Sequence, residues 1–169
     1  MAVVTVKSTA LLAGDLVPSS KSNVQVGPRR LYEDVATVEV TNGDSIGSQF
    51  RLHRVHSSVR MSQLLLKCDA ITSAAADFGI YEIAANGGAV VDADCFASAQ
   101  SIASAIVNTA TDILHESGVL DISEIEQPLW QVLGLTKDPQ KQYDVVATLT
   151  AAATATGTLT VHCRYAQAN

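Results

Sequence analysis

Basic residues, cysteines, aromatic side chains and long apolar runs are all scarce in this chain. Only 11 Lys and Arg stand against 17 Asp and Glu among 169 residues, a formal net charge of −6. Proteins that hold nucleic-acid phosphates carry a basic face, so we expect no nucleic-acid partner. No window approaches the roughly 20 consecutive apolar residues of a membrane-spanning helix, and no basic segment precedes the apolar run at the N-terminus. We therefore expect neither membrane association nor a signal peptide.

Cysteine is limited to three widely spaced positions, Cys68, Cys95 and Cys163, with no C-x-x-C motif. The odd number and the spacing argue against a disulfide framework and against a zinc site. We expect free, buried thiols in a reducing compartment.

Small apolar residues and a period of two dominate what is present. Hydrophobic residues make up 47% of the chain and aromatic residues only 5%, enough for one core built from thin layers. Apolar residues alternate with polar ones in several segments, as in strands with one buried face. The clearest of these are residues 36–41, 62–70, 77–82, 143–151 and 158–165.

Seven or eight such strands, separated by turn signals such as Asn42-Gly43, predict an all-β fold. We expect an antiparallel β-sandwich or jelly roll over residues 36–169, preceded by an extended N-terminal arm over residues 1–35 that is rich in Gly, Pro and Ser. A short helix is expected over residues 128–133, opened by Pro128 and ended by Gly134. Residues 93–116 fit either a helix or two short strands.

Histidine and cysteine residues offer little for catalysis. His53 and His56 do not share a face on a strand, and no carboxylate lies near them in sequence. His162 and Cys163 are adjacent on a strand and point to opposite faces, so they form no catalytic dyad.

Acidic pairs are equally uninformative. Asp92 and Asp94 resemble the start of a calcium loop, but the glycine and the later glutamate of an EF-hand are missing. We interpret them as solvated loop carboxylates. The sequence therefore predicts no enzyme, and no catalytic, cofactor-binding or metal site.

Trp130 and the arginines are candidates for binding to another macromolecule. Trp130 is the single tryptophan; it either packs in the core or stacks on a sugar. The arginines are too sparse for a nucleic-acid patch but are able to form ion pairs with a partner protein. They are Arg29, Arg30, Arg51, Arg54 and Arg60.

Several stretches together resemble a family of small tailed-bacteriophage head proteins, the capsid cement or decoration proteins. The resemblance runs from about Ala36 to the C-terminus. Its stretches are GSQFRLHRVHSSVRMSQLLL, AAADFGIYE, NGGAVVDADCFASAQS, PLWQVLGLTKDPQKQYDVVATLT and TLTVHCRYA. The most specific pieces are DFGIYE, VVDADCF and LWQVLGLTKDPQKQYD.

The resemblance implies a jelly-roll protein on the outside of an icosahedral phage head, assembled in the host cytoplasm. Such a protein clamps neighbouring major capsid subunits against the pressure of packaged DNA. Its partners are the phage major capsid protein and further copies of itself, as a homodimer or homotrimer. The alternative is a β-sandwich binding module for carbohydrate or host attachment, or a component of the tail or neck.

Overall fold

The computed structural model describes residues 30–167, which form eight strands, two short 3-10 segments and one short helix. The strands are β1 (Leu31–Val40), β2 (Gln49–His56), β3 (Arg60–Cys68), β4 (Ala75–Glu82), β5 (Val90–Ser101), β6 (Ile106–Asp112), β7 (Gln142–Ala151) and β8 (Gly157–Ala166). The other elements are η1 (Ala84–Asn86), η2 (Ile122–Glu124) and α2 (Leu129–Val132).

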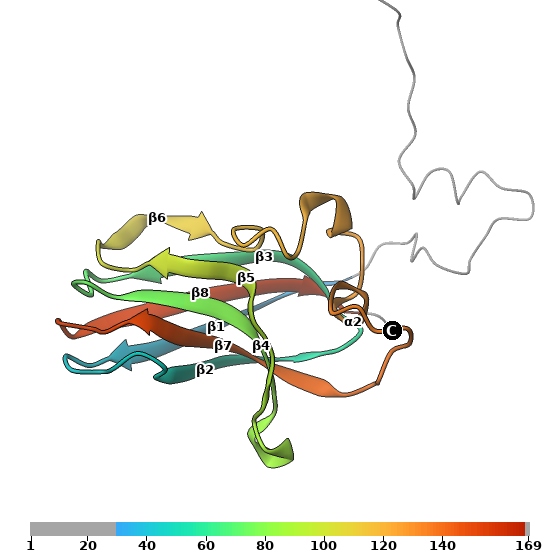
Figure 1. The fold of residues 1–169 in the computed structure, drawn as a ribbon. Helices are drawn as coiled ribbons and strands as arrows, with labels where there is room; N and C mark the ends of the chain where they lie inside the picture. Colours follow the sequence, from blue (N-terminus) through green and yellow to red (C-terminus); the bar gives the residue numbers. More distant parts are fainter. Residues whose placement is uncertain (1–29, 168–169) are drawn as a thin grey trace, which may run out of the picture.

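The strands make two four-stranded sheets that pack face to face (Figure 1). One sheet has the order β1-β8-β3-β6 and the other β2-β7-β4-β5. The first strand pairs with the eighth, the second with the seventh, the third with the sixth and the fourth with the fifth, all antiparallel. This nested pairing is the jelly-roll arrangement of two Greek keys, so the all-β sandwich expected from the sequence is confirmed.

Alternating residues of both sheets fill the core. In β3 the side chains of Leu64, Leu66 and Cys68 are buried, and in β8 those of Leu159 and Val161 are buried. The period of two in the sequence therefore corresponds to one face turned inward. In β4 both faces are covered, because Phe78, Ile80 and also Tyr81 are buried.

The first strand begins earlier than the sequence suggested. β1 starts at Leu31 and pairs along its whole length with β8, from Leu31 opposite Ala166 to Val40 opposite Gly157. Residues 31–35 therefore belong to the sheet, and assigning them to an N-terminal arm was wrong. Their side chains are all exposed and do not alternate between apolar and polar, so a search for a period of two does not detect this part of the edge strand β1. The rest of the expected arm, residues 1–29, lies outside the described residues.

Residues 93–116, which fitted either a helix or two strands, contain most of β5 and the whole of β6. Cys95, Phe96 and Ala97 are consecutive and all buried, which the single apolar stripe of a helix would not produce. Pairing with β4 and β3 decides the conformation here.

The short helix forms where it was expected. Pro128 is the residue before its first turn, and Gly134 follows its end with a φ of 70°. The backbone N–H of Leu129 donates to the carbonyl of Val59 at 2.8 Å, and the N–H of Trp130 donates to that of Ser57 at 3.0 Å. The helix is thereby fixed to the turn between β2 and β3. No helix in the described part of the chain is long and apolar enough to cross a membrane.

Candidate interaction surface

His53, one of the two histidines weighed for catalysis, is a structural bridge between the sheets. Its side chain is 1% exposed, with Nδ1 3.0 Å from Asp34 Oδ2 and Nε2 2.9 Å from the Val161 carbonyl oxygen. His53 comes from β2, whereas Asp34 and Val161 come from β1 and β8 of the opposite sheet. His56 instead contacts the hydroxyl of Ser58 at 2.8 Å. Both rings thus bond within the chain, to different neighbours.

The cysteines are free and buried, as expected. Burial raises the pKa of both Cys95 and Cys163 to about 12, and it also raises the pKa of Cys68. A thiol reacts as its thiolate, so none of these three is prepared for nucleophilic attack. His162 lies on the outer face of β8, where its Nδ1 is 3.2 Å from Glu33 Oε1.

Asp92 and Asp94 are not loop carboxylates, and that interpretation was wrong. Both lie in β5 and both are half-buried. Burial raises the pKa of Asp92, although the backbone N–H of Asp94 donates to it at 3.3 Å. Within residues 30–167 no group of three or more His, Cys, Asp or Glu side chains is arranged to hold a metal ion.

Two arginines of β2, Arg51 and Arg54, converge on one buried carboxylate. Asp144 of β7 is 3% exposed, and Arg54 Nε donates to its Oδ1 at 2.8 Å while Arg51 Nη1 donates to its Oδ2 at 2.9 Å. Burial by itself raises the pKa of Asp144, but the hydrogen bonds and charges of Arg54 and Arg51 outweigh it, so this pKa lies below its usual value. Arg51 and Arg54 thus pair within their own chain, and their pairing with another protein stays a prediction.

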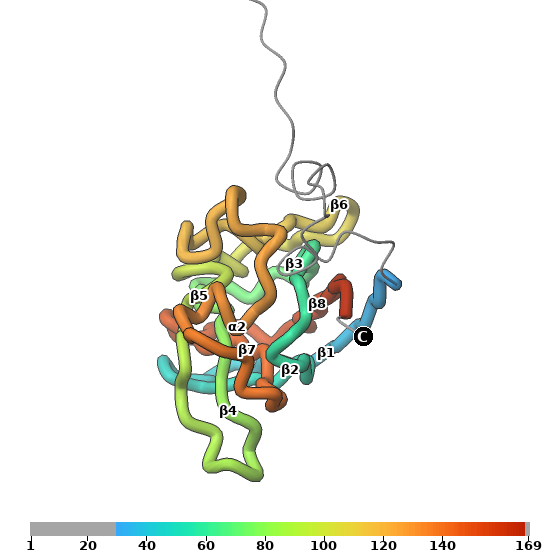
Figure 2. Tube along the Cα trace, turned by 90° about the vertical axis from the view of Figure 1, so that its right-hand side faces the viewer, coloured from blue at the N-terminus to red at the C-terminus, as the bar shows by residue number. Residues whose placement is uncertain are grey.

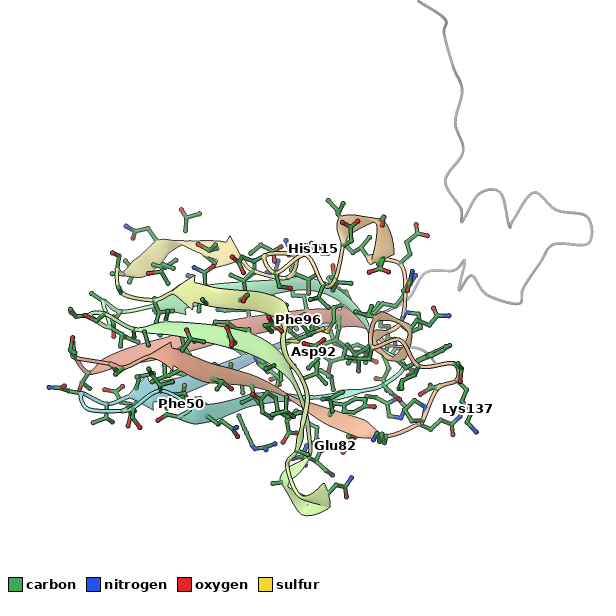
Figure 3. The ribbon with its side chains drawn as sticks, in the orientation of Figure 1. Phe50, Glu82, Asp92, Phe96, His115 and Lys137 are labelled. Carbon is green, nitrogen blue, oxygen red and sulfur yellow. The ribbon has the colours of Figure 1, made fainter. Side chains whose placement is uncertain are left out.

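A second ion pair lies close to this cluster, where β4 ends and β7 begins. Lys141 Nζ donates to Glu82 Oε1, and this hydrogen bond raises the pKa of Lys141. The Lys141 ammonium also lies 5.1 Å from the centre of the Tyr143 ring. Glu82 is the last residue of β4, so the cluster reaches the point where the β4–β5 hairpin leaves the sheet (Figure 3).

Arg51 joins the cluster to that hairpin. Its Nη1 donates to the Glu82 carbonyl at 2.9 Å and its Nη2 donates to the Gly88 carbonyl at 3.1 Å. The Arg51 guanidinium also lies 6.0 Å from the centre of the Tyr81 ring. One side chain of β2 thus holds both arms of the connection between β4 and β5.

The connection and the first two residues of β5, together residues 83–91, extend beyond the body of the sandwich in two perpendicular views (Figures 1 and 2). We call this segment the β4–β5 tip. It contains η1, and Gly87 and Gly88 then reverse the chain with φ values of 90° and 64°. The sequence Asn86-Gly87-Gly88 favours a turn, but nothing in the sequence indicates that this turn projects from the sheet.

Trp130 is half-buried in α2. It is therefore neither fully packed in the core nor fully exposed as a platform for a sugar. Its neighbour Leu129 is fully buried and anchors the helix. The side of α2 that carries Leu129 therefore packs in the core.

Comparison with known proteins identifies the fold. No protein-family model matches the chain, and no curated protein matches it. A chain in the capsid asymmetric unit of cyanophage Pam1 matches with a TM-score of 0.54 and 13% sequence identity, over 89% of this chain and 96% of that chain. A chain in the capsid of Ralstonia phage GP4 matches with a TM-score of 0.53 and 14% identity, over 83% and 86% of the two chains. At such identities the similarity establishes a shared fold.

Proposed function

We propose that this chain is a structural virion protein, a capsid cement or decoration protein. It binds the outer surface of an icosahedral phage head and clamps neighbouring major capsid subunits against the pressure of packaged DNA. The observation that carries the proposal is the structural match to a chain of the Pam1 capsid. The match covers 89% of this chain and 96% of the Pam1 chain. That Pam1 chain is itself part of a capsid, and almost all of it has a counterpart in this chain.

The residues of the sandwich support a clamp rather than a catalyst. The described thiols are buried, and the strong ion pairs hold strands and a hairpin in place. A clamp needs complementary surface and many repeated contacts, because binding several tethered sites raises the effective concentration at each one. Self-association as a dimer or trimer is part of the proposal, since it multiplies those contacts.

The experiment that tests the proposal uses particles of the phage that encodes the chain. We expect quantitative gel analysis of purified virions to find the chain at a copy number comparable with that of the coat protein. Cryo-EM density for the sandwich should lie on the outside of the shell. Absence from purified virions would refute the proposal.

The clamping role has its own test. Particles made without the chain should release DNA at a lower temperature than normal particles, and purified protein added back should restore the normal release temperature. If particles without the chain are equally heat-stable, the chain is a passive component of the virion and the clamp is wrong.

A further inference from the structure

The β4–β5 tip combines exposure with a complete lack of charge. No Asp, Glu, Lys or Arg occurs between Glu82 and Asp92. Val90 is 54% exposed and Val91 is 39% exposed, and η1 holds Ala84 and Ala85 in solvent. An uncharged apolar projection costs solubility, so its exposure in the free chain points to a surface that covers it.

The tip is held in position before any partner arrives. Arg51 bonds to both of its arms, and the backbone N–H of Glu82 donates to the Ala89 carbonyl at 2.8 Å. Gly88 lies so close to Arg51 that a Cβ at this position would be 2.5 Å from Nη2. Asp144 in turn fixes Arg51. Ordering before association reduces the entropy that binding must overcome.

The chemistry of the tip selects its partner. A nucleic acid needs cations, and residues 83–91 contain none. Insertion into a membrane interface relies on aromatic and basic side chains, and the tip has neither. Small side chains on a narrow hairpin fit an uncharged recess of another protein, where a backbone must approach closely.

We propose that the β4–β5 tip inserts into an uncharged, apolar recess on the coat-protein shell and that Arg51 presents it in the required position. This inference rests on the proposed function and adds the contacting element.

The experiment compares two valines of equal exposure, one on the tip and one elsewhere. Val90→Asp places a charge on the tip, and Val107→Asp places the same charge on β6, where the valine is 53% exposed. Both sites are solvent-exposed on edge strands, so thermal melting of the two variants should match that of the wild type. Ala85→Asp provides a second tip variant that replaces Val90→Asp if the latter melts early.

Binding is measured by co-sedimentation of each purified full-length variant with particles made without the chain. The wild type should bind to saturation. Because a charge would be desolvated in an apolar recess, the tip variants should lose about tenfold or more in affinity, whereas Val107→Asp stays within about twofold.

Three outcomes decide the matter. If the tip variants decorate the particles like the wild type, the inference is overturned while the cement function stands. If Val107→Asp loses as much affinity as Val90→Asp, the effect is a general consequence of added charge and the inference is likewise overturned. If the wild type fails to bind, the proposed function is refuted and the inference with it.

Discussion

Asp144 is the one buried acidic side chain among residues 30–167, and its neighbours explain why it is tolerated. A carboxylate loses hydration when it is buried, and two guanidinium groups replace those bonds here. Arg54 lies directly opposite Asp144 in the register of β2 and β7. The pair is thus a cross-strand contact that Arg51 extends to the hairpin.

Asp144→Asn should lower the free energy of unfolding by about 1–3 kcal/mol at neutral pH, because both guanidinium groups lose their charged acceptor. Chemical denaturation measures this difference. The pKa of Asp144 is lowered in the folded chain, so the ionised carboxylate stabilises the fold fully above the pKa of the unfolded carboxyl. This stabilisation is lost as the pH falls through the lowered folded value. The difference in the free energy of unfolding between wild type and variant should therefore disappear in acid. A difference that stays constant with pH would contradict the ionic explanation.

The three cysteine thiols are all buried in the folded chain. Burial and a pKa of about 12 at Cys95 and Cys163 should leave the native chain unreactive toward a thiol reagent at about pH 8. All three cysteines should react once the chain is unfolded. A Val107→Cys variant, with the new thiol on the exposed side of β6, serves as the positive control. Rapid labelling of the wild-type native chain would show that the core opens.

At the scale of elements, the pairing of β4 with β5 depends on one glycine. A Cβ on Gly79 would lie 2.2 Å from the Asp92 carbonyl oxygen and 2.3 Å from the Ala93 carbonyl carbon. The register between β4 and β5 shifts on both sides of this point, from Phe78 opposite Ala97 to Ile80 opposite Asp92. The backbone of β5 therefore bulges over Gly79, and the hairpin that carries the tip starts from this bulge.

Gly79→Ala should cost about 3 kcal/mol or more, because the methyl group meets backbone that has no room to move. Gly157→Ala is the matched comparison: there the nearest atom is Cγ1 of the buried Ile71 side chain at 2.9 Å, so the overlap is smaller and involves a side chain instead of backbone. Thermal or urea denaturation of both variants measures how much stability each one loses. A smaller loss for Gly79→Ala than for Gly157→Ala would contradict the close approach of β5.

For the whole molecule, the pairing of β1 with β8 joins the two ends of the described chain. Residues 31–35 contribute a stack of Tyr32 on Tyr165, with ring centres 5.8 Å apart, and the carboxylate of Asp34 on His53. Glu33 pairs with Arg164 on the outer face. The first strand therefore supports both the last strand and the opposite sheet.

Deleting residues 1–35 should thus destabilise the sandwich by about 3 kcal/mol or more, since it removes half of β1 and leaves His53 without its carboxylate. Deleting residues 1–29 leaves β1 intact and should keep the melting temperature of the full chain. Differential scanning calorimetry of both truncations tests the strand boundary at Leu31. Equal melting temperatures would mean that the first half of β1 contributes nothing.

The sequence by itself determined the all-β class, most strands, the buried cysteines and the short helix between Pro128 and Gly134. Each of these follows from local periodicity or from the backbone limits of Pro and Gly. The His53 bridge, the burial of Asp144 and the place of Asp92 in a strand required the fold. They depend on pairing between residues far apart in the chain, such as Arg54 with Asp144.

Tertiary structure alone also decided the conformation of residues 93–116 and the projection of the β4–β5 tip. In the first case the helical and strand patterns overlap, and hydrogen bonding to β4 and β3 selects the strands. In the second, Asn86-Gly87-Gly88 specifies a turn, but Arg51, which lies on another strand, holds both arms of the projecting hairpin. Local residues set the backbone preference, and distant side chains hold the element in place.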